Sequence, residues 1–219
     1  MGILHTGILG TVTQKVANVV CQKWKGLNTV RELVIPKNPK TPKQVFQRDR
    51  FSFIVKIARM INDTIITVFW KLYATVSTTE WNEFSGDNIK LQPEFSVPET
   101  LFSPDYSKLL LTKGTLEGSV IGGTKTYNST SGQVVVDFSD AILGNGLDTD
   151  KAVLIVIDEE HDYYYLSSLT LNVRSNPPIT FNIAAGLTVA KLHAYLFFYR
   201  GEGEALEVSD SIYTALIAA

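Results

Sequence analysis

The chain divides at Pro36-Lys37-Asn38-Pro39-Lys40-Thr41-Pro42-Lys43, where closely spaced prolines block regular strand pairing and favour an extended backbone. The same stretch contains a helix start: Thr41 can act as the N-cap, Pro42 suits the first helical position, and Gln44 completes a capping box. We therefore expect a boundary near residue 40, with different kinds of structure on its two sides.

The segment before this boundary, residues 1–40, is predicted to be a basic β-hairpin arm. Two runs rich in Val and Thr, Val16 to Lys25 and Thr29 to Ile35, are expected to form its strands, joined at Gly26-Leu27-Asn28. A lone hairpin is only marginally stable in water. The arm is therefore expected to pack on the following helices or on another chain.

The segment after the boundary, residues 41–90, is predicted to be helical. Apolar residues recur there at steps of three and four, at Val45, Phe46, Ile54, Ile57, Ala58 and Ile61, and again at Ile65, Ile66, Phe69, Leu72 and Tyr73. Asn62-Asp63-Thr64 is expected to break or restart the helix. A second, short helix should begin at a capping box of Ser77 and Glu80 and stop at Gly86-Asp87-Asn88. The aromatic residues are assigned to the core.

The remainder comprises a proline-containing linker, residues 91–105, and a β-rich region, residues 106–219. Turn residues recur between short apolar runs there, which is typical of an antiparallel sandwich. The predicted strands are 108–116, 124–127, 133–138, 152–157, 163–169, 179–183, 191–199 and 206–215, with Lys191 to Tyr199 at the centre of a sheet. The expected fold class is α+β, ending in an antiparallel β-sandwich of immunoglobulin or fibronectin type, without an inter-sheet disulfide because Cys21 is the only cysteine.

Charge is distributed unevenly along the chain. Up to Met60 there are eleven Lys and Arg against two acidic residues, and beyond it nine Lys and Arg against twenty Asp and Glu. Such a molecule suits contacts with polyanions or head-to-tail contacts with copies of itself. The residues predicted to bind a partner are Lys15, Lys23, Trp24, Lys25, Arg31, Lys37, Lys40, Lys43, Arg48 and Arg50. No sequence-specific DNA-binding or RNA-binding motif accompanies them.

The sequence shows no catalytic pattern, and we predict no enzyme activity, cofactor, metal site or small-molecule substrate. His5, His161 and His193 lack metal-ligand spacing. The acidic stretch around His161, from Asp158 to Asp162, is typical of a hairpin turn. Neither a signal peptide nor a membrane-spanning run is expected.

Several motifs resemble a known family. They are Gly7-Ile-Leu-Gly10, Val16-Ala-Asn-Val-Val20, Lys23-Trp24-Lys25-Gly26-Leu27-Asn28-Thr29-Val30-Arg31 and Thr41-Pro-Lys-Gln44, with similar segments at Lys108 to Leu116, His193 to Tyr199 and Val208 to Tyr213. The chain resembles a domain-of-unknown-function family of comparable length from Bacteroidetes and their phages. The resemblance implies no known activity and no site residues. A phage context would imply a virion part, such as a ring, collar, neck or tail protein of a crAss-like phage, present in the host cytoplasm during assembly.

Three functions remain open at this point. The first is a structural virion subunit that forms a homo-oligomeric ring through its basic arm and contacts neighbouring virion proteins. The second is a module that contacts nucleic acid non-specifically, lining a DNA channel or coating packaged genome. The third is a sugar-binding sandwich or enzyme that acts through Asp158 to Tyr165, with Tyr163 and Tyr164 stacking on a sugar ring.

Overall fold

The computed structural model describes residues 2–3, 14–16, 18–24, 27–35, 38, 40–96, 101–141 and 144–219, and within these the side chains of 2–3, 14–16, 23–24 and 27–28 are left undescribed. The chain forms two compact units, Met1–Thr41 and Pro42–Ala219. We call them the N-terminal unit and the body.

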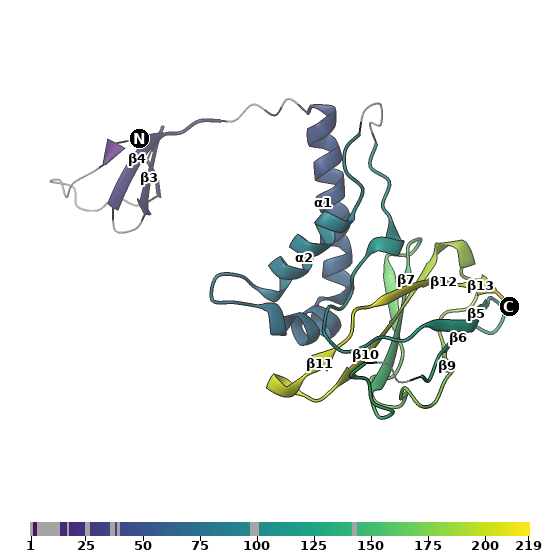
Figure 1. The fold of residues 1–219 in the computed structure, drawn as a ribbon. Helices are drawn as coiled ribbons and strands as arrows, with labels where there is room; N and C mark the ends of the chain where they lie inside the picture. The colour runs from purple at the N-terminus through teal and green to yellow at the C-terminus, as the bar shows by residue number, and fades with distance from the viewer. Residues whose placement is uncertain are drawn as a thin grey trace. The chain divides into compact units, whose positions relative to one another are not determined.

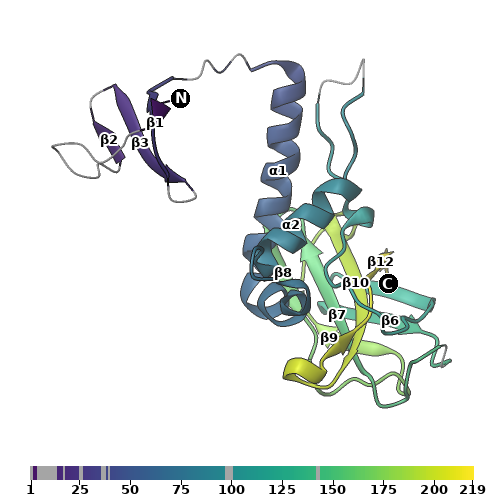
Figure 2. The same ribbon diagram turned by 60° about the vertical axis from the view of Figure 1, so that its left-hand side comes forward.

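The N-terminal unit is an antiparallel sheet. The predicted pairing is confirmed, because β3 (Val19–Trp24) pairs with β4 (Leu27–Glu32) from Val19 opposite Glu32 to Trp24 opposite Leu27. The predicted bounds differ: Leu27 and Asn28, expected in the connection, are paired in β4, and Val16 belongs to a separate strand. Two short strands that were not predicted, β1 (Gly2–Ile3) and β2 (Gln14–Val16), are labelled in Figure 2. They flank the hairpin in the order β1-β4-β3-β2. The sheet edges are therefore two- and three-residue strands, which offer few backbone groups for pairing.

The body begins with helices. The predicted start is confirmed, because α1 (Pro42–Ile61) begins at Pro42. The expected restart also occurs at Asn62, where the chain changes to a π-helix, η1 (Asn62–Trp70), followed by a single 3₁₀ turn, η2 (Lys71–Tyr73). The wider π turn places two adjacent pairs, Ile65 with Ile66 and Phe69 with Trp70, in the core together.

The second helix differs from the prediction at both ends. It runs from Glu80 to Leu91 (α2), and its N-cap is Thr79, whose hydroxyl accepts the Asn82 N–H at 3.3 Å; Ser77 lies in the preceding turn. The helix also continues through Gly86 instead of stopping there. Asn88, expected to end it, is fully buried and bonds to Leu110 of the body, so tertiary contacts override the local stop signal.

Two sheets complete the body. The five-stranded sheet has the order β11-β10-β7-β8, with β12 also paired to β10, and the four-stranded sheet has the order β13-β5-β6-β9. All pairs are antiparallel except β13 with β5. The strands are β5 (Ile121–Asn128), β6 (Gln133–Phe138), β7 (Lys151–Asp158), β8 (Tyr163–Leu166), β9 (Ile179–Asn182), β10 (Leu192–Arg200), β11 (Glu207–Val208), β12 (Ile212–Ala215) and β13 (Ile217–Ala218). The central position predicted for β10 is confirmed.

One predicted strand is wrong and another is divided. Residues 108–116 begin in a 3₁₀ turn, η3 (Tyr106–Lys108), and continue without regular secondary structure apart from a bridge from Leu116 to Ser209. Their backbone groups bond to side chains, such as those of Asn88 and Ser211, instead of to a strand ladder. The predicted strand 206–215 is divided in two, β11 and β12, because Ser209 turns inward and its hydroxyl accepts the Phe198 N–H.

The body has three layers. Alternate residues of β7 and β10, including Val153, Ile155 and Phe197, pack against the helices. Their neighbours, including Leu154 and Phe198, pack against the four-stranded sheet. The helices thus cover one face of the five-stranded sheet and the second sheet covers the other (Figure 1), which gives an α+β body. None of the helices in the described part of the chain is long and apolar enough to cross a membrane.

Candidate functional site

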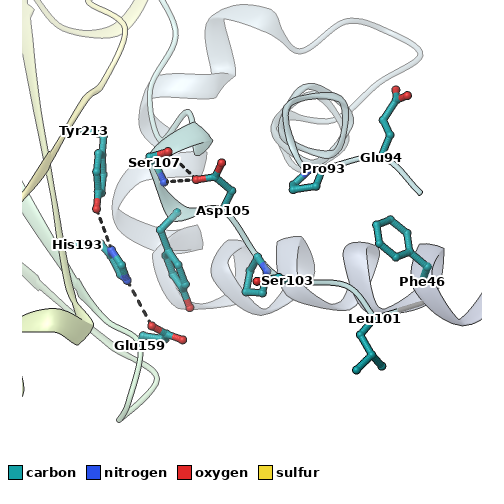
Figure 3. A pocket seen from close by; sticks show the side chains of 12 residues that line it. Phe46, Pro93, Glu94, Leu101, Ser103, Asp105, Ser107, Glu159, His193 and Tyr213 are labelled. Atoms are coloured by element: carbon teal, nitrogen blue, oxygen red, sulfur yellow. Dashed lines mark hydrogen bonds and ion pairs between the residues drawn. The ribbon is translucent and has the colours of Figure 1, made fainter. Parts of the chain in front are cut away.

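The body contains a groove of about 540 Å³ beside α1 (Figure 3). We call it the acid-lined groove, because three carboxylates are among its walls. It is lined by Phe46, Pro93, Glu94, Leu101, Ser103, Pro104, Asp105, Tyr106, Ser107, Glu159, His193 and Tyr213. These residues come from α1, the segment after α2, the turn after β7, β10 and β12, so that the groove exists only in the folded body.

One wall is formed by described residues, 91–96 and 101–105, of the segment predicted as a linker, residues 91–105. The Gln92 side chain clamps its two ends: Nε2 donates to the Asp105 carbonyl and Oε1 accepts the Asp105 N–H, both at 2.9 Å. Phe95 and Phe102 each pack edge-on to Phe46, with ring centres 5.5 Å apart. Residues 91–96 and 101–105 are therefore joined to each other through Gln92 and packed on α1, and together they form one wall of the groove.

The inner end of the groove is organised around His193. Its Nε2 lies 3.5 Å from Glu159 Oε2, its Nδ1 lies 3.3 Å from the Tyr213 hydroxyl, and its ring stacks on Tyr106 with centres 3.9 Å apart and planes 4° apart. Burial lowers the pKa of His193, while its contact with Glu159 acts in the opposite direction. The imidazole is thus held neutral and in one orientation at neutral pH.

This environment predicts a pH dependence of stability. Because the folded-state pKa of His193 lies below the free value of 6.5, the unfolded chain takes up the proton first as pH falls. The contribution of His193 should be complete above pH 6.5 and should be lost as pH falls through its folded pKa. His193→Phe keeps a ring against Tyr106 but cannot titrate. The free energy of unfolding from urea titrations at neutral and mildly acid pH should fall less in the variant than in the parent; equal falls would contradict the prediction.

The three carboxylates of the groove differ in their surroundings. Asp105 accepts bonds from Ser107 and lies 3.5 Å from Lys108, and these contacts lower the pKa of its carboxyl, with the Ser107 hydroxyl as the main cause. Glu159 pairs with Lys191 at 3.3 Å. Glu94 is exposed and forms no ion pair with any residue that the structure describes. The outer end of the groove therefore carries a negative charge without a local counter-ion.

Tyr106 and Tyr213 contribute neutral hydrogen-bonding groups to the groove. Burial is the main cause that raises the pKa of both Tyr106 and Tyr213, so both phenols stay protonated at neutral pH. Across the described part of the chain, no group of three or more His, Cys, Asp and Glu is placed to hold a metal ion. A neutral imidazole, two phenols and three carboxylates form an arrangement suited to recognising a cation through hydrogen bonds and charge.

The predicted partner-binding residues lie in both units. In the N-terminal unit, Arg31 and Lys40 are exposed; Lys15, Lys23 and Trp24 lie on β2 and β3, and their side chains are not described. Lys25 and Lys37 lie outside the described residues. In the body, Lys43 and Arg48 are exposed on α1.

Arg50 occupies a different environment from the one expected. It is buried, and its guanidinium donates to the Ile89 carbonyl and, at 3.0 Å, to the Gln92 carbonyl. Both acceptors lie at the C-terminal end of α2, where cations are favoured. Arg50 therefore holds α2 against α1 inside the body.

The acidic stretch around His161 forms the turn between β7 and β8. The buried Asp158 carboxylate accepts the N–H groups of Glu160 and His161 and lies 2.7 Å from the His161 ring. Of the two tyrosines proposed to stack on a sugar, Tyr164 is half-buried and shares a hydrogen bond with Thr64, whereas Tyr163 is exposed. The stretch therefore offers one exposed ring beside an ordered turn.

Comparison with protein families identifies a family of unknown function. The model of a family of unknown function, DUF6266, matches residues 10–215. The chain belongs to the DUF6266 family. The expected membership of an uncharacterised family of this length is thereby confirmed. Searches of curated proteins and of solved structures found no match to the chain.

Proposed function

We propose that the chain is a non-enzymatic structural subunit that assembles into a homo-oligomeric ring through its basic N-terminal unit. The observation that carries the proposal is that few of the described side chains in that unit are buried. Among its described side chains only Thr29 is buried, while apolar side chains such as Val34 and Ile35 are 69% and 82% exposed. A small sheet with so little buried surface gains stability by packing on another surface.

Charge supports the same proposal. Residues 1–41 contain six Lys and Arg against one Glu, whereas residues 42–219 contain fourteen Lys and Arg against twenty-one Asp and Glu. The N-terminal unit is therefore strongly positive and the body negative. Opposite charges on two parts of one chain favour head-to-tail contacts between copies and set their orientation.

In this proposal the body is a rigid building block. Its two facing sheets would form a β-sandwich of immunoglobulin or fibronectin type, with the helices as an outer layer. The subunit would belong to a virion, at the neck, collar or tail of a phage particle, and would be made in the host cytoplasm. The support for this location is the sequence resemblance described above, together with a site suited to binding.

The proposal predicts self-association that depends on exposed cations of the N-terminal unit. Sedimentation velocity of the full-length protein over a range of concentrations should show an oligomer, and Arg31→Gln with Lys40→Gln should weaken association about tenfold. Added salt should weaken it as well, because the Debye length falls from about 10 Å at 0.1 M to about 3 Å at 1 M.

A matched control is available in the body. Arg59 and Lys71 are exposed and of the same types, so that Arg59→Gln with Lys71→Gln removes the same charge elsewhere. This pair should leave the oligomer unchanged. A parent protein that stays monomeric at high concentration, alone and with neighbouring virion proteins, would contradict the proposal.

Non-specific nucleic-acid binding is the second candidate, because the N-terminal unit is strongly basic. Binding to single- and double-stranded DNA should then fall steeply with salt. We rank it second because the negative body would be repelled by a polyanion. Absence of binding at low salt would remove it.

A further inference from the structure

We infer that the acid-lined groove of one copy receives a Lys or Arg side chain from the N-terminal unit of a second copy. The inference rests on the proposed function and deepens it, since it names the surface on which the basic unit docks.

The groove combines an apolar wall with negative charge at both ends. Leu101 is 74% exposed, and it faces the groove near the ring of Phe46. Glu94 lies at this outer end, and Glu159 lies at the other end beside His193 (Figure 3). A long cationic side chain suits this arrangement, because its methylene stem covers apolar surface while its charged head reaches a carboxylate.

Glu94 and Glu159 can each accept further hydrogen bonds from such a ligand. Within the described part of the chain, Glu94 forms no ion pair, and the side chain of Glu159 contacts only Lys191, at 3.3 Å, and the neutral His193. His193 cannot supply a second positive charge at neutral pH, because burial lowers its pKa. An incoming ammonium or guanidinium would therefore form charge-assisted hydrogen bonds in a partly enclosed site.

Charge complementarity within the sequence identifies the occupant as another copy of the chain. The net charge of residues 1–41 is positive, and the groove lies in a body of net negative charge. Exposed Arg31 and Lys40 are donors of the required type. Each copy then has one donor unit and one acceptor groove, which is a head-to-tail interface, and such interfaces close into rings when the rotation between copies is suitable.

The test uses two full-length variants with complementary defects. The donor variant carries Arg31→Gln and Lys40→Gln, and the groove variant carries Glu94→Gln and Glu159→Gln. Neutral amides are chosen so that no new attraction is introduced. Each variant alone should associate about tenfold more weakly than the parent. Mixed in equal amounts, they should form a one-to-one heterodimer that does not grow, because only one intact donor and one intact groove can meet.

The possible outcomes distinguish failure of the groove inference from failure of the proposed function. If the parent forms oligomers and the groove variant does so equally well, the groove inference fails while the proposed function stands. If both variants are impaired but their mixture forms no heterodimer, the groove inference also fails. A parent that is monomeric throughout, as it would be if the N-terminal unit docked on its own chain, overturns both.

Two controls separate loss of the groove contact from a general loss of charge and from a folding defect. Glu202→Gln with Glu204→Gln removes two exposed carboxylates outside the groove, in the turn after β10, and should leave association unchanged. Glu94→Gln alone alters an exposed side chain and should retain the parent's thermal unfolding temperature while weakening association. An unchanged association constant in this single variant would show that the unpaired carboxylate does not contact the partner.

Discussion

Arg174→Met is expected to destabilise the body by about 3–5 kcal/mol, the cost of breaking a buried ion pair by removing one partner. Arg174 is fully buried, and its guanidinium donates to the Glu117 and Gly118 carbonyls and lies 4.0 Å from the centre of the Phe198 ring. Its Nε lies 3.4 Å from Oδ2 of Asp150, which is also fully buried. The substitution keeps much of the side-chain volume. Among the described residues it leaves the Asp150 carboxylate with only the more distant Arg200, at 3.6 Å, as a cation.

The measurement is the urea midpoint for unfolding of the full-length protein, monitored by far-UV circular dichroism. The slope of the unfolding free energy against urea concentration should be the same in parent and variant. Arg59→Met is the matched control, because Arg59 is exposed on α1, and its effect should stay within about 0.5 kcal/mol. Combining Arg174→Met with Asp150→Asn should cost less than the sum of the two single changes, since each removes the other's partner. A loss below about 1 kcal/mol in Arg174→Met would show that the pair contributes little.

The elements that could be predicted are those whose local pattern agrees with their packing. β6 was predicted residue for residue, because Gln133–Phe138 alternates between the interior and the surface. β7 and β10 appear as continuous apolar runs since both of their faces are covered, and short buried strands have that pattern. The start of α1 followed from its proline and capping residues, which act within one turn of helix.

The groove could not be predicted, because its residues meet only through tertiary structure. Glu159 and His193 are 34 positions apart, and Tyr213 comes from yet another strand. The Gln92 side chain joins the two ends of a proline-containing segment to each other, although the composition of that segment is that of a linker. Arg50 was predicted to bind a partner because it lies in the basic part of the sequence, and only the carbonyl groups at the end of α2 explain its buried position.

Trp70→Ala is expected to cost about 3–5 kcal/mol, the range for removing a large buried aromatic side chain. Trp70 is fully buried where η1 ends, and its ring packs edge-on to Phe84 of α2 with centres 5.4 Å apart. Its Nε1 donates to the Leu111 carbonyl at 2.8 Å. One side chain thus connects η1, α2 and the segment that contains Leu111. Its removal leaves a cavity and an unpaired carbonyl group at Leu111.

Trp70→Phe separates most of the packing from the hydrogen bond, because a six-membered aromatic ring stays in the site while the N–H donor is lost. Its cost should be about 1–3 kcal/mol, the penalty for leaving a buried acceptor unsatisfied. Trp81→Phe is the matched control: Trp81 is only partly buried, its Nε1 has no hydrogen-bond partner among the described residues, and the change should stay within about 0.5 kcal/mol. Urea midpoints measured by far-UV circular dichroism rank the three variants. If Trp70→Phe were as mild as Trp81→Phe, the bond to Leu111 would not stabilise the fold, and the whole effect of Trp70→Ala would come from packing.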